Sequence, residues 1–214
     1  MLLSTAFFPP VSWFAAACQA DVVSLEACEN YCKQSYRNRC HIASASGVEA
    51  ISVPIVHRGD IFHTRITGIE VDYSVPWVKK AWKAIESAYG TSAFFEFYKD
   101  DVYAILSSGY TYLWDLNLAL IEFFIRKIGV DVKFIPTREF TPLPVDDPQD
   151  LRYAIHPKKQ NSVLNKLGLE KPYFQVFAGK YGFVYDLSVM DLLFNEGPDS
   201  LLSVVPFSRI SNQR

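Results

Sequence analysis

The sequence predicts a single mixed α/β domain whose strand order it leaves undetermined. The chain has 214 residues and half of them are hydrophobic, which is enough for one sizeable core. Short strand-like segments are interspersed along the chain with segments of helical periodicity. Because no internal repeat or low-complexity tract is visible, we expect one domain over residues 1–214.

The chain is predicted to open with a strand, a helix and a second strand. Residues 2–8 and 21–27 have the length and apolar composition of short buried strands. A compact helix that starts at Pro9-Pro10 separates them, and Trp13–Cys18 supplies the buried side of that helix.

A hairpin is predicted next, because β-branched residues lie on both sides of the turn glycine Gly47. Its strands are expected over His41–Ala45 and Val48–Val56. Pro54 lacks the N–H that a strand ladder uses, so it should end the second strand or lie at a sheet edge. Residues 66–73 are also expected to be extended.

Two helices and a strand are predicted in the middle of the chain. Pro76 suits the first turn of a helix over Trp77–Tyr89, whose apolar side chains recur at helical spacing. Tyr110–Lys127 has the clearest apolar stripe, and Gly129 should end that helix. Val130–Ile135 follows with the composition of a strand.

The last third is predicted to begin with a loop. Residues 136–148 contain four prolines and two aspartates, which favours a surface loop. Ser162–Leu167 predicts a short helix and Tyr173–Phe177 a buried strand. Ser188 has the position of a capping residue for a helix over Val189–Glu196.

Charge and hydropathy argue against two classes of protein. The net charge of −2 does not favour nucleic-acid binding, which depends on a basic surface, although a local basic groove stays open as an alternative. The most apolar helical segment, Leu116–Ile128, is shorter than the roughly 20 residues that a membrane span needs. No positive residue precedes Lys33, as a signal peptide would require, so we expect a cytoplasmic protein.

The cysteine pattern predicts neither an obligatory disulfide nor a metal. All four cysteines lie in the first fifth of the chain. A core of this size needs no covalent cross-link, and free cysteine often acts as a small apolar residue. A zinc site would use Cys28, Cys32, Cys40 and His41, but their spacing lacks the two-residue loops of common zinc modules.

The most informative segment is residues 28–41, which place three cations, three thiols, a carboxylate and an imidazole between apolar segments. Such a cluster favours a polar surface or a ligand cleft, since burial without partners costs solvation energy. The pattern Glu-Asn-Tyr-x-Lys-Gln-Ser-Tyr-Arg-Asn-Arg, followed by Gly47 and Ile-Ser-Val-Pro at residues 51–54, closely resembles the WbqC-like protein family.

The resemblance extends over nearly the whole chain and includes Trp77 and Trp82. One departure is Cys28, because the family often has histidine before the glutamate. The other similar segments are Phe7–Phe14, Ile85–Tyr89, Phe94–Tyr98, Tyr173–Phe177 and Asp191–Gly197.

The resemblance implies a cytoplasmic bacterial protein of surface-polysaccharide (O-antigen) biosynthesis that acts on an amino-sugar intermediate. The leading hypothesis is a transferase that modifies the sugar by acyl or aminoacyl transfer. The expected partner is a sugar nucleotide or an activated acyl donor, and no cofactor motif is recognised. The competing hypothesis is a non-enzymatic ligand- or partner-binding module of a biosynthetic complex.

The predicted site centres on the 28–41 segment. Arginine offers a two-pronged donor to phosphate or carboxylate, so Arg37 and Arg39 are expected to hold an anionic donor or nucleotide. The candidate catalytic residues are Glu29 or His41 as general base and Cys40 as nucleophile. The candidate binding residues are Asn30, Lys33, Gln34, Arg37, Asn38, Arg39, Trp82, Gln175 and Asn195.

Structural readings of the same residues stay open. The stretch Lys33–Cys40 presents an anion-binding surface whether it is extended or helical, but it can equally form a salt-bridged face. Cys40 and Trp82 can be core residues. If the site is a single cleft, Gln175 and Asn195 should form its wall.

Overall fold

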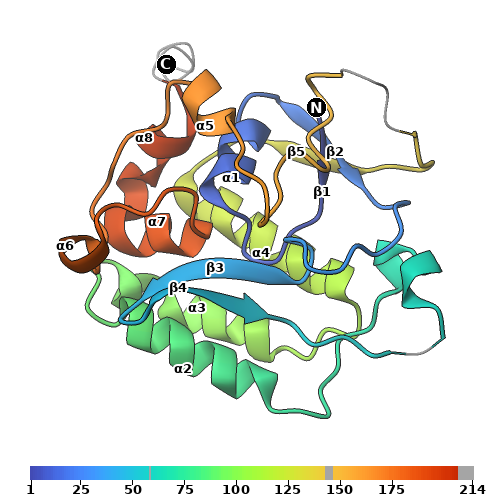
Figure 1. The fold of residues 1–214 in the computed structure, drawn as a ribbon, viewed down its shortest axis with the longest axis horizontal. Helices are drawn as coiled ribbons and strands as arrows, with labels where there is room; N and C mark the ends of the chain where they lie inside the picture. The colour runs from blue at the N-terminus through green and yellow to red at the C-terminus, as the bar shows by residue number, and fades with distance from the viewer. Residues whose placement is uncertain (58, 143–146, 207–214) are drawn as a thin grey trace.

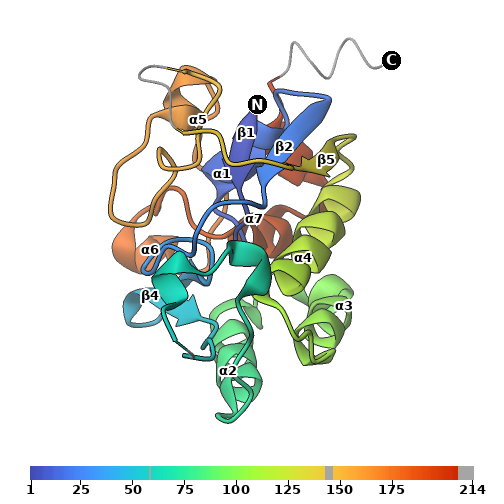
Figure 2. The ribbon, with the colours of Figure 1, turned by 90° about the vertical axis from the view of Figure 1, so that its right-hand side faces the viewer.

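The computed structural model describes residues 1–57, 59–142 and 147–206, and it confirms the mixed α/β class. The strands form a three-stranded parallel sheet and a separate antiparallel hairpin. In Figure 1 the hairpin crosses the middle of the molecule, with the parallel sheet above it and helices α2 (Trp77–Tyr89) and α3 (Phe95–Ser107) below. The side view in Figure 2 shows the same order of layers.

The parallel sheet joins segments that are far apart in the chain. Strand β1 (Leu2–Ser4) leads through α1 (Val11–Ala17) to β2 (Val22–Glu26), as predicted, although both strands are shorter than the apolar segments that contain them. Strand β5 (Lys133–Pro136) pairs with the other side of β2, so the order is β1-β2-β5.

The predicted hairpin is confirmed as β3 (Arg39–Ser44) and β4 (Gly47–Ser52), paired from Arg39 opposite Ser52 to the turn at Gly47. Strand β4 ends before Pro54, as expected. Because side chains alternate along a strand, Cys40 and Ile42 of β3 are buried while the residues between and before them face outward.

Helix α4 (Leu113–Ile128) forms the centre of the core and ends at Gly129, as predicted, with φ 81°. Its apolar stripe is buried, and the ring of Phe124 lies against two aromatic rings from the β1–α1 region. Those two rings belong to Phe8 and Phe14, with centroids 5.9 and 6.2 Å from that of Phe124. Edge-to-face aromatic contacts of this kind fasten the opening segment to the helical layer.

The C-terminal part adds four short helices: α5 (Val163–Lys166), α6 (Ala178–Tyr181), α7 (Val189–Glu196) and α8 (Leu201–Val204). Helix α7 matches the prediction, and the Ser188 hydroxyl accepts a hydrogen bond from the Met190 N–H at its start. It ends at Gly197, where φ is 55° and a Cβ would lie only 2.5 Å from the Phe94 ring. A side chain at this position would require the packed ring to move.

Three predictions about elements were wrong or incomplete. Tyr173–Phe177 is not a strand, because the Gln175 side chain makes the hydrogen bonds to the Val184 backbone that a ladder would have made. Helix α3 was not predicted. The 66–73 segment begins with a short 3-10 helix, Ile66–Gly68, and continues with isolated bridges. Of the proline-rich loop near 136–148, residues 143–146 lie outside the described residues, and β5 ends at Pro136.

A buried polar cluster links the C-terminal helices to the loop before α6. The Asp191 carboxylate accepts hydrogen bonds from the Tyr173 hydroxyl at 2.7 Å and the Gln175 amide at 2.8 Å. Burial nevertheless raises the pKa of Asp191 to about 6, and these hydrogen bonds only partly offset that rise. The ionised form is therefore less favourable in the folded protein than in the unfolded chain.

We expect the folded protein to lose stability as Asp191 ionises. Its pKa is higher in the folded state than in the unfolded chain, so the unfolding free energy should fall by up to about 3 kcal/mol between about pH 4 and pH 6. Urea denaturation across this range should give a flatter profile for Asp191→Asn. The exposed Asp100→Asn is the control and should keep the wild-type profile. Parallel profiles for Asp191→Asn and wild type would contradict this assignment.

Candidate functional site

The motif around residues 29–38 is neither a strand nor a helix. Its first part is tied to the segment after a 3-10 helix at Ile61–His63, since the Tyr31 N–H donates to the Thr64 carbonyl at 2.9 Å and the Ile66 N–H donates to the Glu29 carbonyl at 2.9 Å. The chain then makes successive turns, with Gln34 at φ 57°. The simple two-residue alternation expected of a strand therefore does not apply before β3.

Arg37 points into the protein and forms a buried ion pair with Glu29. Its Nε and Nη2 atoms donate to the two carboxylate oxygens at 3.1 and 2.6 Å. Nη2 also donates to the Ser4 hydroxyl at 2.6 Å, and the arginine is only 2% exposed. The expectation that Arg37 holds an anionic donor is corrected by this geometry, and Glu29 is likewise committed to the pair and is not placed as a general base.

A second buried arginine, which the sequence did not single out, extends this cluster. Arg152 donates to the Glu26 carboxylate at 2.7 Å and to Asp150 at 2.6 Å. Its backbone carbonyl lies 3.3 Å from Arg37 Nη2 and accepts a hydrogen bond there. The two arginines thus join β1, β2, the motif and the 150–152 segment in one internal network.

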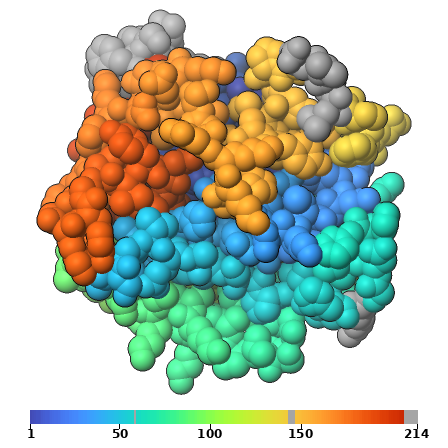
Figure 3. All heavy atoms as spheres, viewed as in Figure 1, coloured from blue at the N-terminus to red at the C-terminus, as the bar shows by residue number. Residues whose placement is uncertain are grey.

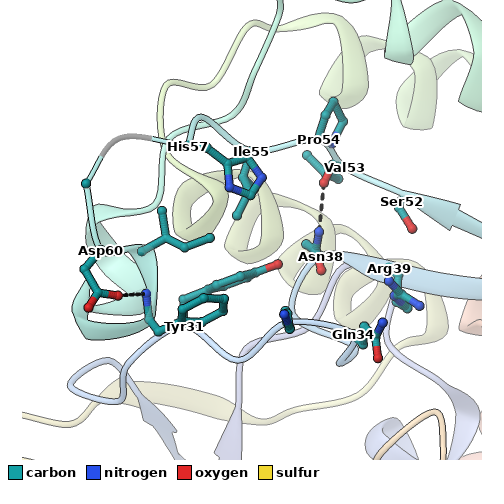
Figure 4. Close-up of a pocket in the computed structure, with 14 residues that line it drawn as sticks. Tyr31, Gln34, Asn38, Arg39, Ser52, Val53, Pro54, Ile55, His57 and Asp60 are labelled. Atoms are coloured by element: carbon teal, nitrogen blue, oxygen red, sulfur yellow. Dashed lines mark hydrogen bonds between the residues drawn. The ribbon is translucent and has the colours of Figure 1, made fainter.

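Arg39, two residues after Arg37, faces a cavity of about 740 Å³ between the motif, β4 and the 53–62 segment. Figure 4 shows Arg39 and Gln34 on one side of this cavity, His57 on another, and the Tyr31 ring between them. We call this space the first cavity. Its lining consists of Tyr31, Lys33, Gln34, Asn38, Arg39, Ser52, Val53, Pro54, Ile55, His57, Gly59, Asp60, Ile61 and Phe62.

Two buried polar atoms of cavity-lining residues have no hydrogen-bond partner among the described residues. They are Arg39 Nε and Asn38 Oδ1. The Asn38 amide nitrogen is held by the Val53 carbonyl at 2.9 Å, which orients the side chain. Buried polar groups in folded proteins nearly always have partners, so an unpaired donor and acceptor at a cavity indicate where a ligand or water binds.

The first cavity combines cations with an apolar wall. The Lys33 ammonium lies 4.9 Å from the centroid of the Phe62 ring, which is 45% exposed. Lys33, Arg39 and the imidazole of His57 are its basic groups, and Asp60 is its one carboxylate among the described residues. Convergent polar groups on a mainly apolar surface are typical of small-molecule sites, and the balance here favours an anion.

Cys40 lies in the core and not in the first cavity. Its thiol is fully buried, and burial raises the pKa of the thiol well above its usual range. A thiol that stays protonated and inaccessible is a poor nucleophile, so the structure corrects this assignment. His41 is half-buried and lines a neighbouring cavity. Asn30 is exposed and does not line the first cavity.

Three predicted binding residues lie elsewhere. Trp82 stacks on Phe95 with ring centroids 6.1 Å apart, within the packing of α2 against α3. Gln175 belongs to the Asp191 cluster, and the Asn195 amide donates to the Asp191 backbone carbonyl at 2.7 Å. Neither Gln175 nor Asn195 lines the first cavity, so the single-cleft expectation was wrong, although both residues are buried and hydrogen-bonded.

The described residues contain no group of three or more histidine, cysteine or acidic side chains that could hold a metal ion. No disulfide joins any two of the four cysteines, all of which lie within the described residues. Among the helices within the described ranges, none is long and apolar enough to cross a membrane.

We expect Arg37→Ala to destabilise the protein. The substitution leaves Glu29 charged and buried without its partner, which should lower the unfolding free energy by about 3–5 kcal/mol. Urea denaturation measures this change. The double variant Glu29→Gln with Arg37→Met should recover part of the loss, because it removes both charges. A change below about 1 kcal/mol for Arg37→Ala would contradict the structural role.

Comparison with known proteins shows which family the chain resembles. The model of the WbqC-like protein family matches residues 5–166, which include the motif, the hairpin and the whole first cavity. The uncharacterized protein Rv1507c of Mycobacterium tuberculosis is 31% identical over 104 residues, or 48% of this chain and 44% of that protein. The chain thus spans less than half the length of this curated relative. No solved structure matches. The extent of the family match shows that the chain belongs to the WbqC-like protein family.

Proposed function

We propose that this protein is a transferase that modifies an amino-sugar intermediate of bacterial surface-polysaccharide biosynthesis by acyl or aminoacyl transfer. The first cavity would hold the anionic part of a sugar nucleotide or of an activated acyl donor. The family resemblance supports the pathway, and the transfer reaction is our hypothesis. The cavity supports the anionic ligand.

The observation that carries the proposal is the Arg39 guanidinium. It lines the first cavity, and its Nε atom is buried without a partner among the described residues. Arginine keeps its charge at all physiological pH values, so a guanidinium with no ion-pair partner among the described residues favours binding of a carboxylate or phosphate. Lys33 adds a second positive charge to the same wall. The Glu29 carboxylate does not compete for Arg39, because it is paired with Arg37.

The remaining walls suit the other parts of a nucleotide or acyl carrier. Phe62 presents a partly exposed ring on which a base can stack, and Ile55 and Ile61 continue the apolar surface. The unpaired Asn38 carbonyl oxygen accepts a hydrogen bond from a ligand hydroxyl or amine. The cavity of about 740 Å³ is large enough for a ligand of this kind.

The alternative is a non-enzymatic binding module, and one observation favours it. Neither Glu29 nor Cys40 lines the first cavity, so the two most reactive groups of the motif are absent from its described walls. Incubation of the protein with UDP-glucosamine and acetyl-CoA, followed by mass spectrometry, separates the two functions. An acetylated sugar would support the transferase, and bound but unchanged ligands would support the module.

Arg39→Ala should weaken binding of anionic ligands at least tenfold while leaving the fold intact, because Arg39 makes no described ion pair within the protein. Calorimetric titration with UDP and with acetyl-CoA measures the effect. Arg126→Ala is the matched control, since Arg126 is exposed at the end of α4. Equal affinities for the two variants would argue against the first cavity as the anion site.

A further inference from the structure

A second cavity of about 370 Å³ lies beside the first, along β3. Its polar lining includes the phenol of Tyr36, the imidazoles of His41 and His156, the amide of Asn161 and the carboxylates of Glu170 and Asp186. Figure 3 shows the orange segment around residues 150–165 lying against the blue segment around residues 30–45 on this face of the molecule. The walls therefore come from three distant parts of the chain.

Hydrogen bonds hold these walls together. The Ser188 N–H donates to the His41 carbonyl at 2.9 Å, so the 184–188 segment runs beside β3. Asp186 accepts from the Ser12 backbone at 2.8 Å, from the Ser12 hydroxyl at 2.9 Å and from the Asn161 amide at 2.8 Å. Asp186 has φ 58°, a conformation that side-chain-bearing residues seldom adopt. This wall is a fixed part of the fold.

The ionisable groups of the second cavity differ from those of the first. Burial, and then the nearby charge of Arg39, lower the pKa of His41, and burial is also the main reason that the pKa of His156 is lowered. Both imidazoles are therefore uncharged at neutral pH and can each donate and accept a hydrogen bond. Two carboxylates and one lysine, Lys159, complete the charged lining.

The two cavities are neighbours on one strand. Arg39 lines the first and His41 the second, and both face outward because they are two residues apart on β3, about 7 Å between Cα atoms. Gln34, which lines the first cavity, is hydrogen-bonded to Lys158, next to the wall of the second. Both cavities therefore border the same part of β3, and a ligand that occupied both would extend across the Gln34–Lys158 contact.

We infer that the second cavity binds the sugar ring of a nucleotide-linked amino sugar whose diphosphate occupies the first cavity. This inference rests on the proposed function and adds the placement of the substrate. Sugar hydroxyls both donate and accept hydrogen bonds, which matches the neutral imidazoles of His41 and His156 and the phenol of Tyr36. A sugar amine, in its protonated form, matches the exposed carboxylate of Glu170. The volume is near the lower end of the roughly 300–1,000 Å³ of ligand pockets, which suits a single ring.

Calorimetric titration with UDP and UDP-glucosamine tests the inference. Wild-type protein should bind UDP-glucosamine about tenfold more tightly than UDP, because the sugar adds contacts in the second cavity. His41→Ala should abolish this difference while leaving the affinity for UDP within about twofold. Glu170→Gln, at an exposed position, should reduce the same difference. Arg39→Ala should weaken both ligands.

The controls separate this inference from the proposed function. Glu122→Gln, on the exposed side of α4, should behave as wild type with both ligands. The second cavity is not the sugar site if wild-type protein binds UDP and UDP-glucosamine with equal affinity. The same conclusion follows if His41→Ala and Glu170→Gln leave the affinity difference unchanged. In both cases the proposal of an anion site at Arg39 is unaffected. If neither ligand binds, both proposals fail.

Discussion

The buried ion pair between Glu29 and Arg37 is the interaction on which the arrangement of the motif depends. Transfer of two charges into the core is costly, and it is offset here by a two-pronged contact and by further hydrogen bonds to Ser4 and the Arg152 carbonyl. The pair fastens the motif to β1 and to the 150–152 segment. With Arg37 turned inward, the chain enters β3 with Arg39 facing outward. The position of Arg39 at the first cavity and the internal network around Arg37 therefore depend on the same ion pair.

Much of the fold follows from local sequence. The helices around Trp77, Leu116 and Met190 have clear apolar periodicity and end at glycine, and the structure places them close to the predicted ranges. The order of the parallel strands could not be predicted, because pairing of β2 with β5 depends on packing between distant segments. The apolar run around Gln175 misled the prediction, since a short apolar segment suits a strand or a buried loop equally well.

The candidate site was predictable as a segment and not as a set of side chains. Lys33, Gln34, Asn38 and Arg39 line the first cavity, as a motif rich in cations and amides suggested. Arg37 and Arg39 are two arginines of the same motif, yet Arg37 is buried and Arg39 lines the first cavity. They differ because the turns before β3 break the alternation of side chains. The lining around residues 52–62 carried no chemical motif, so only the fold brings it to the cavity.

The alternation of side chains along strand β3 determines which reactive groups of the motif reach a cavity. Alternation along a strand places Cys40 in the core and its two half-buried neighbours, Arg39 and His41, on the opposite face. The same alternation that buries the Cys40 thiol places the Arg39 guanidinium at the first cavity and the neutral His41 imidazole at the second. An anion bound at Arg39 would therefore lie two residues along β3 from an imidazole able to accept a proton, and transfer chemistry at this site would not use Cys40 as the nucleophile.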